Sequence, residues 1–288
     1  MRKILFASVA LALALSTMNT PRVLAAAAPK EALVEFEMMT WPEVKAALAA
    51  GKTTALVYTG GTEQRGPQAV NGGHTLKGRE ISKAIALELG NAISMPVLPY
   101  TPNNASADLP GTIGLTPDLL GALLERITEQ TIANGFKNVV LMGDHGGGQG
   151  DLGPKNVYDT VAKKLDAKYA AKGIHVYYCD EVYKPATFEF DRITHEKGYP
   201  LGTHASLSDT SQMMYLEKGR NWIRRDLVPK AIGTPLDDNR KPIGPDPHNG
   251  IQGDASRSTE ELGKMFFDMQ IAYAVKQIRG FIPAKAGN

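Results

Sequence analysis

The chain has 288 residues, of which 43% are hydrophobic and 22% are charged, values typical of a folded globular protein. This composition excludes a disordered chain, and a formal net charge of +2 gives no basic footprint for nucleic acid. The length is enough for one large core or for two modest domains.

The N-terminus has the pattern of a secretory signal peptide. Arg2 and Lys3 form a short positive region, and the apolar run Ile4–Leu15 is followed by small residues that offer a cleavage region. The run is too short to cross a bilayer comfortably, although an uncleaved anchor stays an alternative. We therefore expect residues 1–28 to be removed and residues 29–288 to be periplasmic or secreted, with a net charge near −1.

Short apolar strands alternate with amphipathic helices along the mature chain. Strands are predicted at residues 53–59, 92–98, 138–142 and 174–179. Helices are predicted at residues 41–50, 76–89, 117–134, 157–165 and 262–273. Thr40 and Thr116 are predicted N-caps, and Ser258 to Glu261 has the spacing of a capping box. The pattern predicts one α/β domain, with a mainly parallel β-sheet flanked by helices on both faces and a long loop at residues 233–249.

The single cysteine, Cys179, lies in an apolar run that is typical of a buried strand. A lone cysteine forms no internal disulfide, and a nucleophilic cysteine would need exposure and a neighbouring base. We therefore interpret Cys179 as a core residue.

Polar side chains follow two of the predicted strands. The loop after the first strand carries Glu63 and Arg65, and the segment that leads to the next helix carries His74. The loop after the third strand carries Asp144 and His145. Because ligands bind at the carboxyl ends of the strands in open parallel sheets, we expect the site there.

One carboxylate and two imidazoles, from Glu63, His74 and His145, suit Zn²⁺ or a similar divalent ion with an open position for water. Gly146 and Gly147 would let a substrate approach the backbone closely. The glycine run lacks the lysine and hydroxyl residue of a phosphate-binding P-loop, which argues against nucleotide binding. A plain surface role for the histidines stays open.

Five segments in chain order resemble the creatininase-like amidohydrolases. They are Thr62-Glu63-Gln64-Arg65-Gly66-Pro67, Pro110-Gly111-Thr112-Ile113, Gly143-Asp144-His145-Gly146-Gly147, His204-Ala205 with Asp209-Thr210-Ser211, and Gly253-Asp254 with Thr259-Glu260-Glu261-Leu262-Gly263. The resemblance implies a creatininase-like α/β fold, a metal centre that is often binuclear, hydrolysis of cyclic or small amides, and a homo-oligomer.

By position, the resemblance implies that Glu63 and His145 bind metal and that His204 donates a proton to the leaving nitrogen. Asp209 falls on an active-site glutamate, and a general base or an orienting group is implied. A helix N-cap is an equal alternative for Asp209. Asp144 is expected to support a ligand, to contact the substrate or to form a turn, and Gly146 to line the substrate.

Two departures from the family pattern lie in this site. Arg65 stands where relatives have a metal-binding histidine, and His74 stands where they have a bridging aspartate. Arginine stays protonated and offers no lone pair, so we expect one divalent metal, Zn²⁺ before Mn²⁺, at Glu63, His74 and His145. Arg65 would then bind a substrate carboxylate or a developing oxyanion, with a surface ion pair as the alternative.

These observations predict an exported amidohydrolase that uses metal-activated water to cleave a C–N bond in a small cyclic or compact amide. We expect a small-molecule substrate and a homo-oligomer, with no nucleic acid partner and no membrane partner after signal removal. Two alternatives stay open: a non-catalytic periplasmic small-molecule-binding relative, and a metal-dependent lactonase or isomerase. Metal content separates the binding protein from the enzymes, and product analysis separates the two enzymes.

Overall fold

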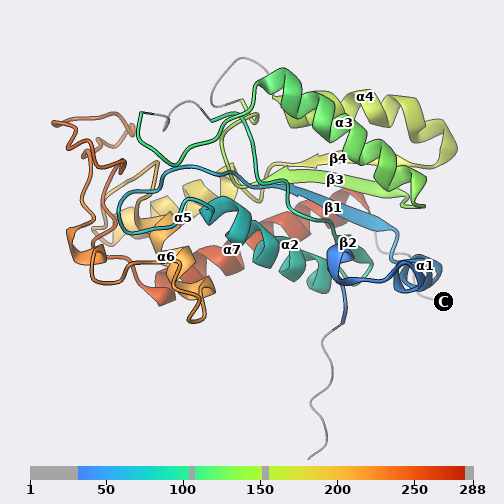
Figure 1. The fold of residues 1–288 in the computed structure, drawn as a ribbon, viewed down its shortest axis with the longest axis horizontal. Helices are drawn as coiled ribbons and strands as arrows, with labels where there is room; N and C mark the ends of the chain where they lie inside the picture. Colours follow the sequence, from blue (N-terminus) through green and yellow to red (C-terminus); the bar gives the residue numbers. More distant parts are fainter. Residues whose placement is uncertain (1–31, 104–107, 151–155, 283–288) are drawn as a thin grey trace, which may run out of the picture. The chain divides into compact units, whose positions relative to one another are not determined.

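The computed structural model describes residues 32–103, 108–150 and 156–282, and the predicted signal peptide lies outside them. The helices and strands belong to one unit that begins at Leu33, and Figure 1 shows their arrangement. In chain order they are η1 Phe36–Met38, α1 Trp41–Ala49, β1 Thr54–Thr59, α2 Gly73–Leu89, β2 Ala92–Ser94, α3 Pro117–Ala133, β3 Asn138–Gly143, α4 Val157–Tyr169, η2 Ala170–Lys172, β4 His175–Cys179, α5 Lys184–Glu196, α6 Leu207–Leu216, η3 Val228–Lys230 and α7 Glu260–Phe281.

The four strands form one parallel sheet in the order β2-β1-β3-β4. In its centre β1 pairs with β3 from Thr54 opposite Asn138 to Thr59 opposite Gly143, so the two strands end side by side. All six residues of β1 are buried, which explains its continuous apolar, β-branched sequence. The loops that follow β1 and β3 therefore start at neighbouring points of one sheet edge.

Helices cover both faces of the sheet, as the sequence predicts. Ala55 and Val57 of β1 pack in a core cluster with residues of α3 and α4. Leu56 and Tyr58 pack in a second cluster with residues of α2 and α7. This alternation follows from the two-residue period of a strand, and Figure 1 shows the pairs α3/α4 and α2/α7 on opposite sides of the sheet.

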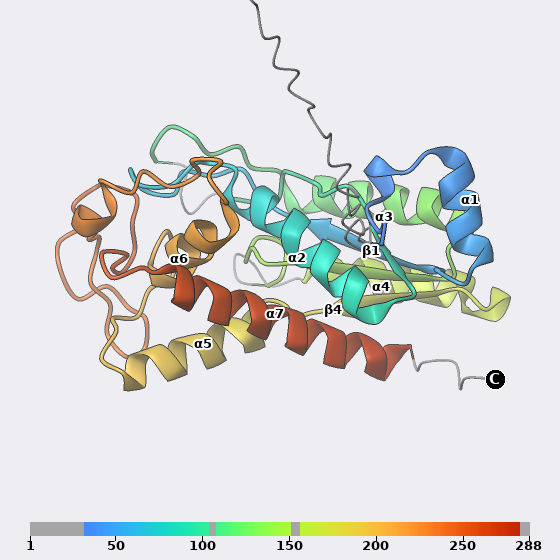
Figure 2. The same ribbon diagram turned by 90° about the horizontal axis from the view of Figure 1, so that it is seen from below.

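Two further helices, α5 and α6, lie beyond the carboxyl ends of the strands, whereas α1 lies at the opposite end of the sheet (Figure 1). Figures 1 and 2 show α5, α6 and the loops on either side of η3 at the end of the unit toward which the strands run. Between η3 and α7, residues 231–259 form turns and isolated bridges without helix or strand, which agrees with the predicted long loop. In the part of the chain that the structure describes, no helix is long and apolar enough to cross a membrane.

Several elements differ from the predictions. α7 continues to Phe281 and α4 to Tyr169, both beyond their predicted ends. α2 begins at Gly73, before its predicted start at residue 76. β2 stops at Ser94, and Pro96, which has no N–H for a ladder bond, lies just beyond it. α5 was not predicted, although it is an amphipathic helix that buries four of its 13 residues. The N-cap of α7 is Thr259 and not Ser258, since the Thr259 side chain accepts the Leu262 N–H.

Candidate functional site

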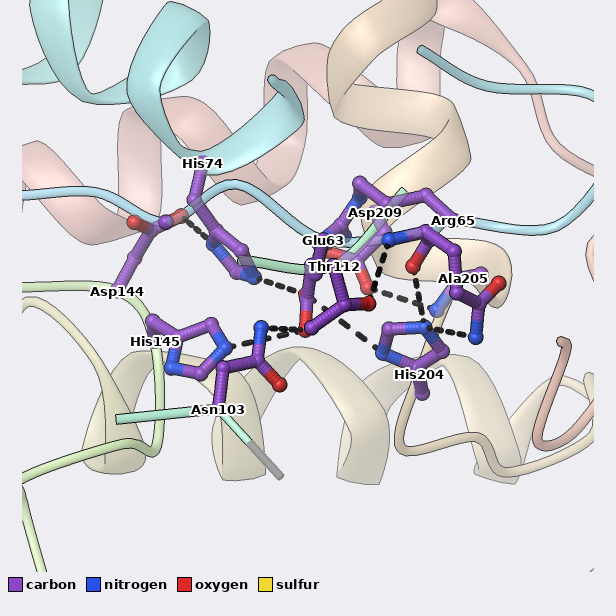
Figure 3. A network of polar contacts seen from close by, with 12 residues as sticks. Glu63, Arg65, His74, Asn103, Thr112, Asp144, His145, His204, Ala205 and Asp209 are labelled. Atoms are coloured by element: carbon purple, nitrogen blue, oxygen red, sulfur yellow. Dashed lines mark hydrogen bonds and ion pairs between the residues drawn. The ribbon is translucent and has the colours of Figure 1, made fainter. Parts of the chain in front are cut away.

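Glu63, in the loop after β1, is the centre of a buried polar network (Figure 3). Its Oε1 lies 2.7 Å from Arg65 Nη1 and 3.0 Å from His74 Nε2. Its Oε2 accepts from Asn103 Nδ2 at 2.7 Å and faces His145 Nε2 at 3.1 Å. Burial alone would raise the pKa of Glu63, but the neighbouring imidazoles of His145 and His74 hold that pKa well below its ordinary value. The carboxylate is therefore ionised.

The two histidines bring their ring nitrogens to this carboxylate from different elements. His74 lies in the first turn of α2, and Asp144 Oδ2 holds its Nδ1 at 3.0 Å, so that Nε2 points to Glu63. His145 follows β3, and its Nδ1 accepts the Gly147 N–H at 2.8 Å, so that its Nε2 also points to Glu63. One ligand atom from each of Glu63, His74 and His145 lies within 4.8 Å of the others. This donor set fits a divalent ion, which would replace the proton on His145 Nε2.

A closed ring of alternating charge surrounds this set. Its members are, in order, Glu63, Arg65, Asp209, Lys77, Asp144 and His74. Arg65 Nη2 pairs with Asp209 Oδ1, and Lys77 Nζ lies 2.9 Å from Asp209 Oδ1 and 3.2 Å from Asp144 Oδ2. Three carboxylates thus face two permanent cations, and the remaining negative charge suits a bound cation or a protonated imidazole.

The charges in the ring fix one another. Burial alone would raise the pKa of both aspartates. Arg65 and Lys77 instead hold the pKa of Asp209 well below its ordinary range. His74 and Lys77 do the same for the pKa of Asp144. Burial would lower the pKa of His74, but the Asp144 carboxylate raises it above its ordinary value. Both aspartates therefore stay ionised at neutral pH.

His204 approaches the network from the other side of Glu63. Its Nε2 lies 2.8 Å from the backbone oxygen of Gln64 and 3.2 Å from the side-chain Nε2 of the same residue. Its Nδ1 lies 3.6 Å from Glu63 Oε1. Burial lowers the pKa of His204, although the charge of Glu63 opposes this, so the ring is neutral at neutral pH. Asp209 Oδ2 accepts the Ala205 N–H at 3.1 Å and so fixes the backbone next to His204.

A cavity of about 510 Å³ opens onto this network. The proposed ligands Glu63, His74 and His145 line it. So do five other residues that the sequence singled out: Asp144, Gly146, Gly147, His204 and Asp209. The size lies within the range of about 300–1,000 Å³ that is typical of small-molecule sites.

Two expectations from the sequence need correction. Arg65 is fully buried and is not among the described residues that line the cavity, so the expected direct contact with a substrate does not fit. Asp209 lies inside the first turn of α6, whose N-cap is Ser206, so the N-cap interpretation is wrong. Both side chains instead belong to the charged ring.

Three further residues of the site were not predicted. Lys77 follows His74 by three residues, so both lie on one face of α2, a signal that appears once the helix begins at Gly73. Gln64, which lines the cavity, was seen only as part of a matching segment. Asn103 lies in an irregular segment, and nothing in the sequence near it indicates a site.

The fold and the site define an α/β protein with a candidate metal centre at the carboxyl ends of its parallel strands. The chain belongs to the creatininase family, because the family's sequence model, described as creatinine amidohydrolase, matches residues 37–278. The fold is creatininase-like, as the sequence resemblance implied.

Solved structures support this assignment of the fold. The chain is similar to the Mn form of creatininase, to a creatininase mutant of the Zn-Zn type and to a creatininase mutant complexed with creatine. In each comparison the identity is 21%, the TM-score is 0.68, and the match covers 88% of this chain and 100% of the other. A search of curated proteins gave no match.

Proposed function

We propose that the mature chain is an exported, metal-dependent amidohydrolase that hydrolyses a C–N bond in a small cyclic or compact amide. The convergence of Glu63, His74 and His145 on one cavity carries this proposal. Membership of a family of amidohydrolases supports the reaction class, and the creatine complex of a relative supports a small-molecule substrate.

Glu63, His74 and His145 would hold one divalent ion, with Zn²⁺ preferred to Mn²⁺. Relatives described as Mn and Zn-Zn forms support these two metals. Such an ion supplies Lewis acidity and lowers the pKa of a bound water. Arg65 and Lys77 place two fixed positive charges beside this set, and their repulsion disfavours a second divalent ion.

His204 is proposed to move the proton. Its Nε2 contacts the backbone oxygen and the side-chain amide of Gln64, so we assign the exchange of a proton to Nδ1, which faces Glu63. Because its pKa is lowered, neutral His204 would take a proton from the attacking water at Nδ1 and then deliver it to the leaving nitrogen. This order adds a base step to the proton donation that the family resemblance implied.

Asp209 and Arg65 are proposed to position the other groups. Asp209 stays ionised between Arg65 and Lys77, which makes it a poor base. It holds the Ala205 N–H and so places His204, while Arg65 holds Glu63 in one orientation. Asp144 orients His74, and Gly146 and Gly147 leave room for the substrate beside His145.

The decisive experiment is elemental analysis of purified mature protein, wild type beside His145→Ala. We expect about one Zn²⁺ or Mn²⁺ per chain in the wild type and its loss in the variant, because three ligands become two. Amide substrates are then screened by product analysis, which also detects lactone hydrolysis or isomerisation. Two ions per chain would contradict the role given to Arg65 and Lys77.

The alternative is a small-molecule-binding relative without catalysis. The ion pair between Arg65 and Glu63 favours it, since an internal cation already occupies one oxygen of the central carboxylate. A wild-type protein that takes up no divalent metal, even after addition of Zn²⁺ or Mn²⁺, would establish this alternative in place of the hydrolase.

Export and assembly complete the proposal. Export is supported by the sequence of residues 1–28 alone, and we expect the protein in the periplasmic or secreted fraction with an N-terminus near residue 29. Light scattering on the mature chain is expected to give a homo-oligomer. Full-length chain in the membrane fraction, or a monomer in solution, would contradict these two parts separately.

A further inference from the structure

Arg240, in the long loop before α7, lines the cavity together with Phe188 of α5. Its guanidinium carbon lies 4.6 Å from the centre of the Phe188 ring, and its Nη2 lies 2.8 Å from Asp191 Oδ2. The Phe188 residue is 53% exposed and the Arg240 side chain is 25% exposed, and both line the cavity. A cation and an aromatic ring thus share one accessible surface.

A tight turn presents Arg240 in this position. The Asp237 carboxylate accepts the N–H groups of Asn239 and Lys241 at 2.9 and 2.8 Å. The Arg240 N–H bonds to the Asp237 carbonyl at 2.8 Å, and Arg240 itself has a left-handed φ of 60°. The turn therefore fixes the backbone of Arg240 in one conformation.

The guanidinium keeps unused donors. Within residues 32–103, 108–150 and 156–282, its contact with Asp191 is made through Nη2, and neither Nε nor Nη1 forms a hydrogen bond. Asp246 lines the same cavity, but its Oδ1 already accepts the Thr234 hydroxyl and the His248 N–H, at 3.3 and 2.8 Å. The arrangement therefore leaves Arg240 able to bind an anion from the cavity.

We propose that Arg240 and Phe188 form a recognition subsite for a substrate carboxylate and the flat apolar group that carries it. A guanidinium fork matches a carboxylate in charge and geometry, and the ring of Phe188 offers an apolar face beside it. Arg240 and Glu63 line the same cavity, whose volume of about 510 Å³ suits one compact molecule. The substrate class is then a carboxylate-bearing amide, which refines the proposed function.

The test measures binding by calorimetry, so it does not depend on turnover. Phenylacetate and phenylacetamide, which have the same shape and differ in charge, are titrated into wild type, Arg240→Met and Arg257→Met. Arg257 is the matched control, because it also stacks on a ring, that of Tyr199 at 4.0 Å, but does not line the cavity. Wild type and Arg257→Met are expected to bind the acid at least about tenfold more tightly than the amide, and Arg240→Met is expected to lose this preference.

Three results would overturn the subsite. The first two are seen in the wild type, so they need no assumption about the folding of a variant. They are equal affinities for the acid and the amide, and no binding of either compound. The third is acid binding that survives in Arg240→Met and is lost in His145→Ala, which would place the carboxylate on a metal. Acid binding that needs Arg240 in a protein without metal or hydrolysis would support the subsite and contradict the proposed function.

Discussion

At the scale of single residues, the site depends on charges that compensate one another inside the protein. Arg65 and Lys77 are 0% and 1% exposed, and each contacts two carboxylates. Removal of one partner from a buried pair leaves an uncompensated charge, which costs more than the pair contributes. Each member of the ring should therefore be sensitive to neutral substitution.

Lys77→Met tests this sensitivity. We expect a loss of about 3 kcal/mol in the free energy of unfolding, because Asp144 and Asp209 would share fewer cations. Lys163→Met is the matched control, since Lys163 is 77% exposed and pairs with Asp159 on the surface, where such pairs contribute within about 0.5 kcal/mol. Urea denaturation of both variants measures the difference, and equal effects would contradict the structural role of the ring.

Gly147→Ala tests the close approach of the loop after β3. A Cβ at Gly147 would lie 1.8 Å from the Pro102 carbonyl oxygen and 2.9 Å from His145 Nδ1, so the loop must move. We expect a loss of about 2 kcal/mol or more, together with reduced metal content. Gly121→Ala in α3 should instead stabilise by about 0.5–1 kcal/mol, because its Cβ meets only Val157 Cγ1 at 3.6 Å. Thermal unfolding that ranks the two variants the other way would refute this argument.

At the scale of elements, the start of a helix decides which side chains reach the site. Because α2 begins at Gly73, His74 and Lys77 lie on one face of its first turn and point toward the carboxyl ends of the strands. The first turn of α6 supplies Asp209 in the same way. The residue at which each helix begins therefore sets which side chains join the charged ring.

The cap of α7 provides a direct comparison. Thr259→Ala should cost about 1 kcal/mol, because its hydroxyl accepts the Leu262 N–H at 3.2 Å. Ser258→Ala should change stability by less than about 0.5 kcal/mol, because the Ser258 hydroxyl makes one long bond, to Leu207 O at 3.5 Å. Chemical denaturation distinguishes the two, and a larger effect at Ser258 would restore the cap expected from the sequence.

At the scale of the whole molecule, buried carboxylates give stability two opposite dependences on pH. Asp144 and Asp209 have lowered pKa values, so their contribution is present above the unfolded pKa of about 4 and is lost as the pH falls further. Burial raises the pKa of Asp191 to about 6. The positive charge of Arg240 acts to lower this pKa, and the negative charge of Asp209 acts to raise it. The contribution of Asp191 is therefore present below about pH 4 and is lost as the pH rises through about 6.

Asp191→Asn isolates the second effect. Between pH 4 and pH 7, the wild type should lose of the order of 2 kcal/mol of unfolding free energy relative to the variant, because the folded chain holds this proton more tightly. The comparison cancels the titration of the histidines, which both proteins share. Parallel curves from denaturation at several pH values would contradict the raised pKa.

The architecture, and the three residues Glu63, His74 and His145 that converge in the structure, could be predicted from sequence pattern and resemblance. Strands such as Thr54–Thr59 are continuously apolar because both of their faces are covered, and that pattern is local. Glu63 and His145 could be chosen because they follow such strands, whose carboxyl ends must meet at one edge. The early end of β2 was less accessible, because Pro96 ends the ladder just beyond it, and α5 was not predicted although it is amphipathic.

Which side chains contact one another in the site could be seen only in the folded structure. Lys77, Asn103 and Arg240 come from segments with no shared pattern, and their roles depend on carboxylates that lie far away in the sequence. Arg65 has a sequence position that suggests contact with a substrate, yet it is enclosed between Glu63 and Asp209. Periodicity reports which face of an element is buried, whereas the partner of a buried charge is fixed by long-range packing, because a charge in a low dielectric must find its counterion wherever the fold places it.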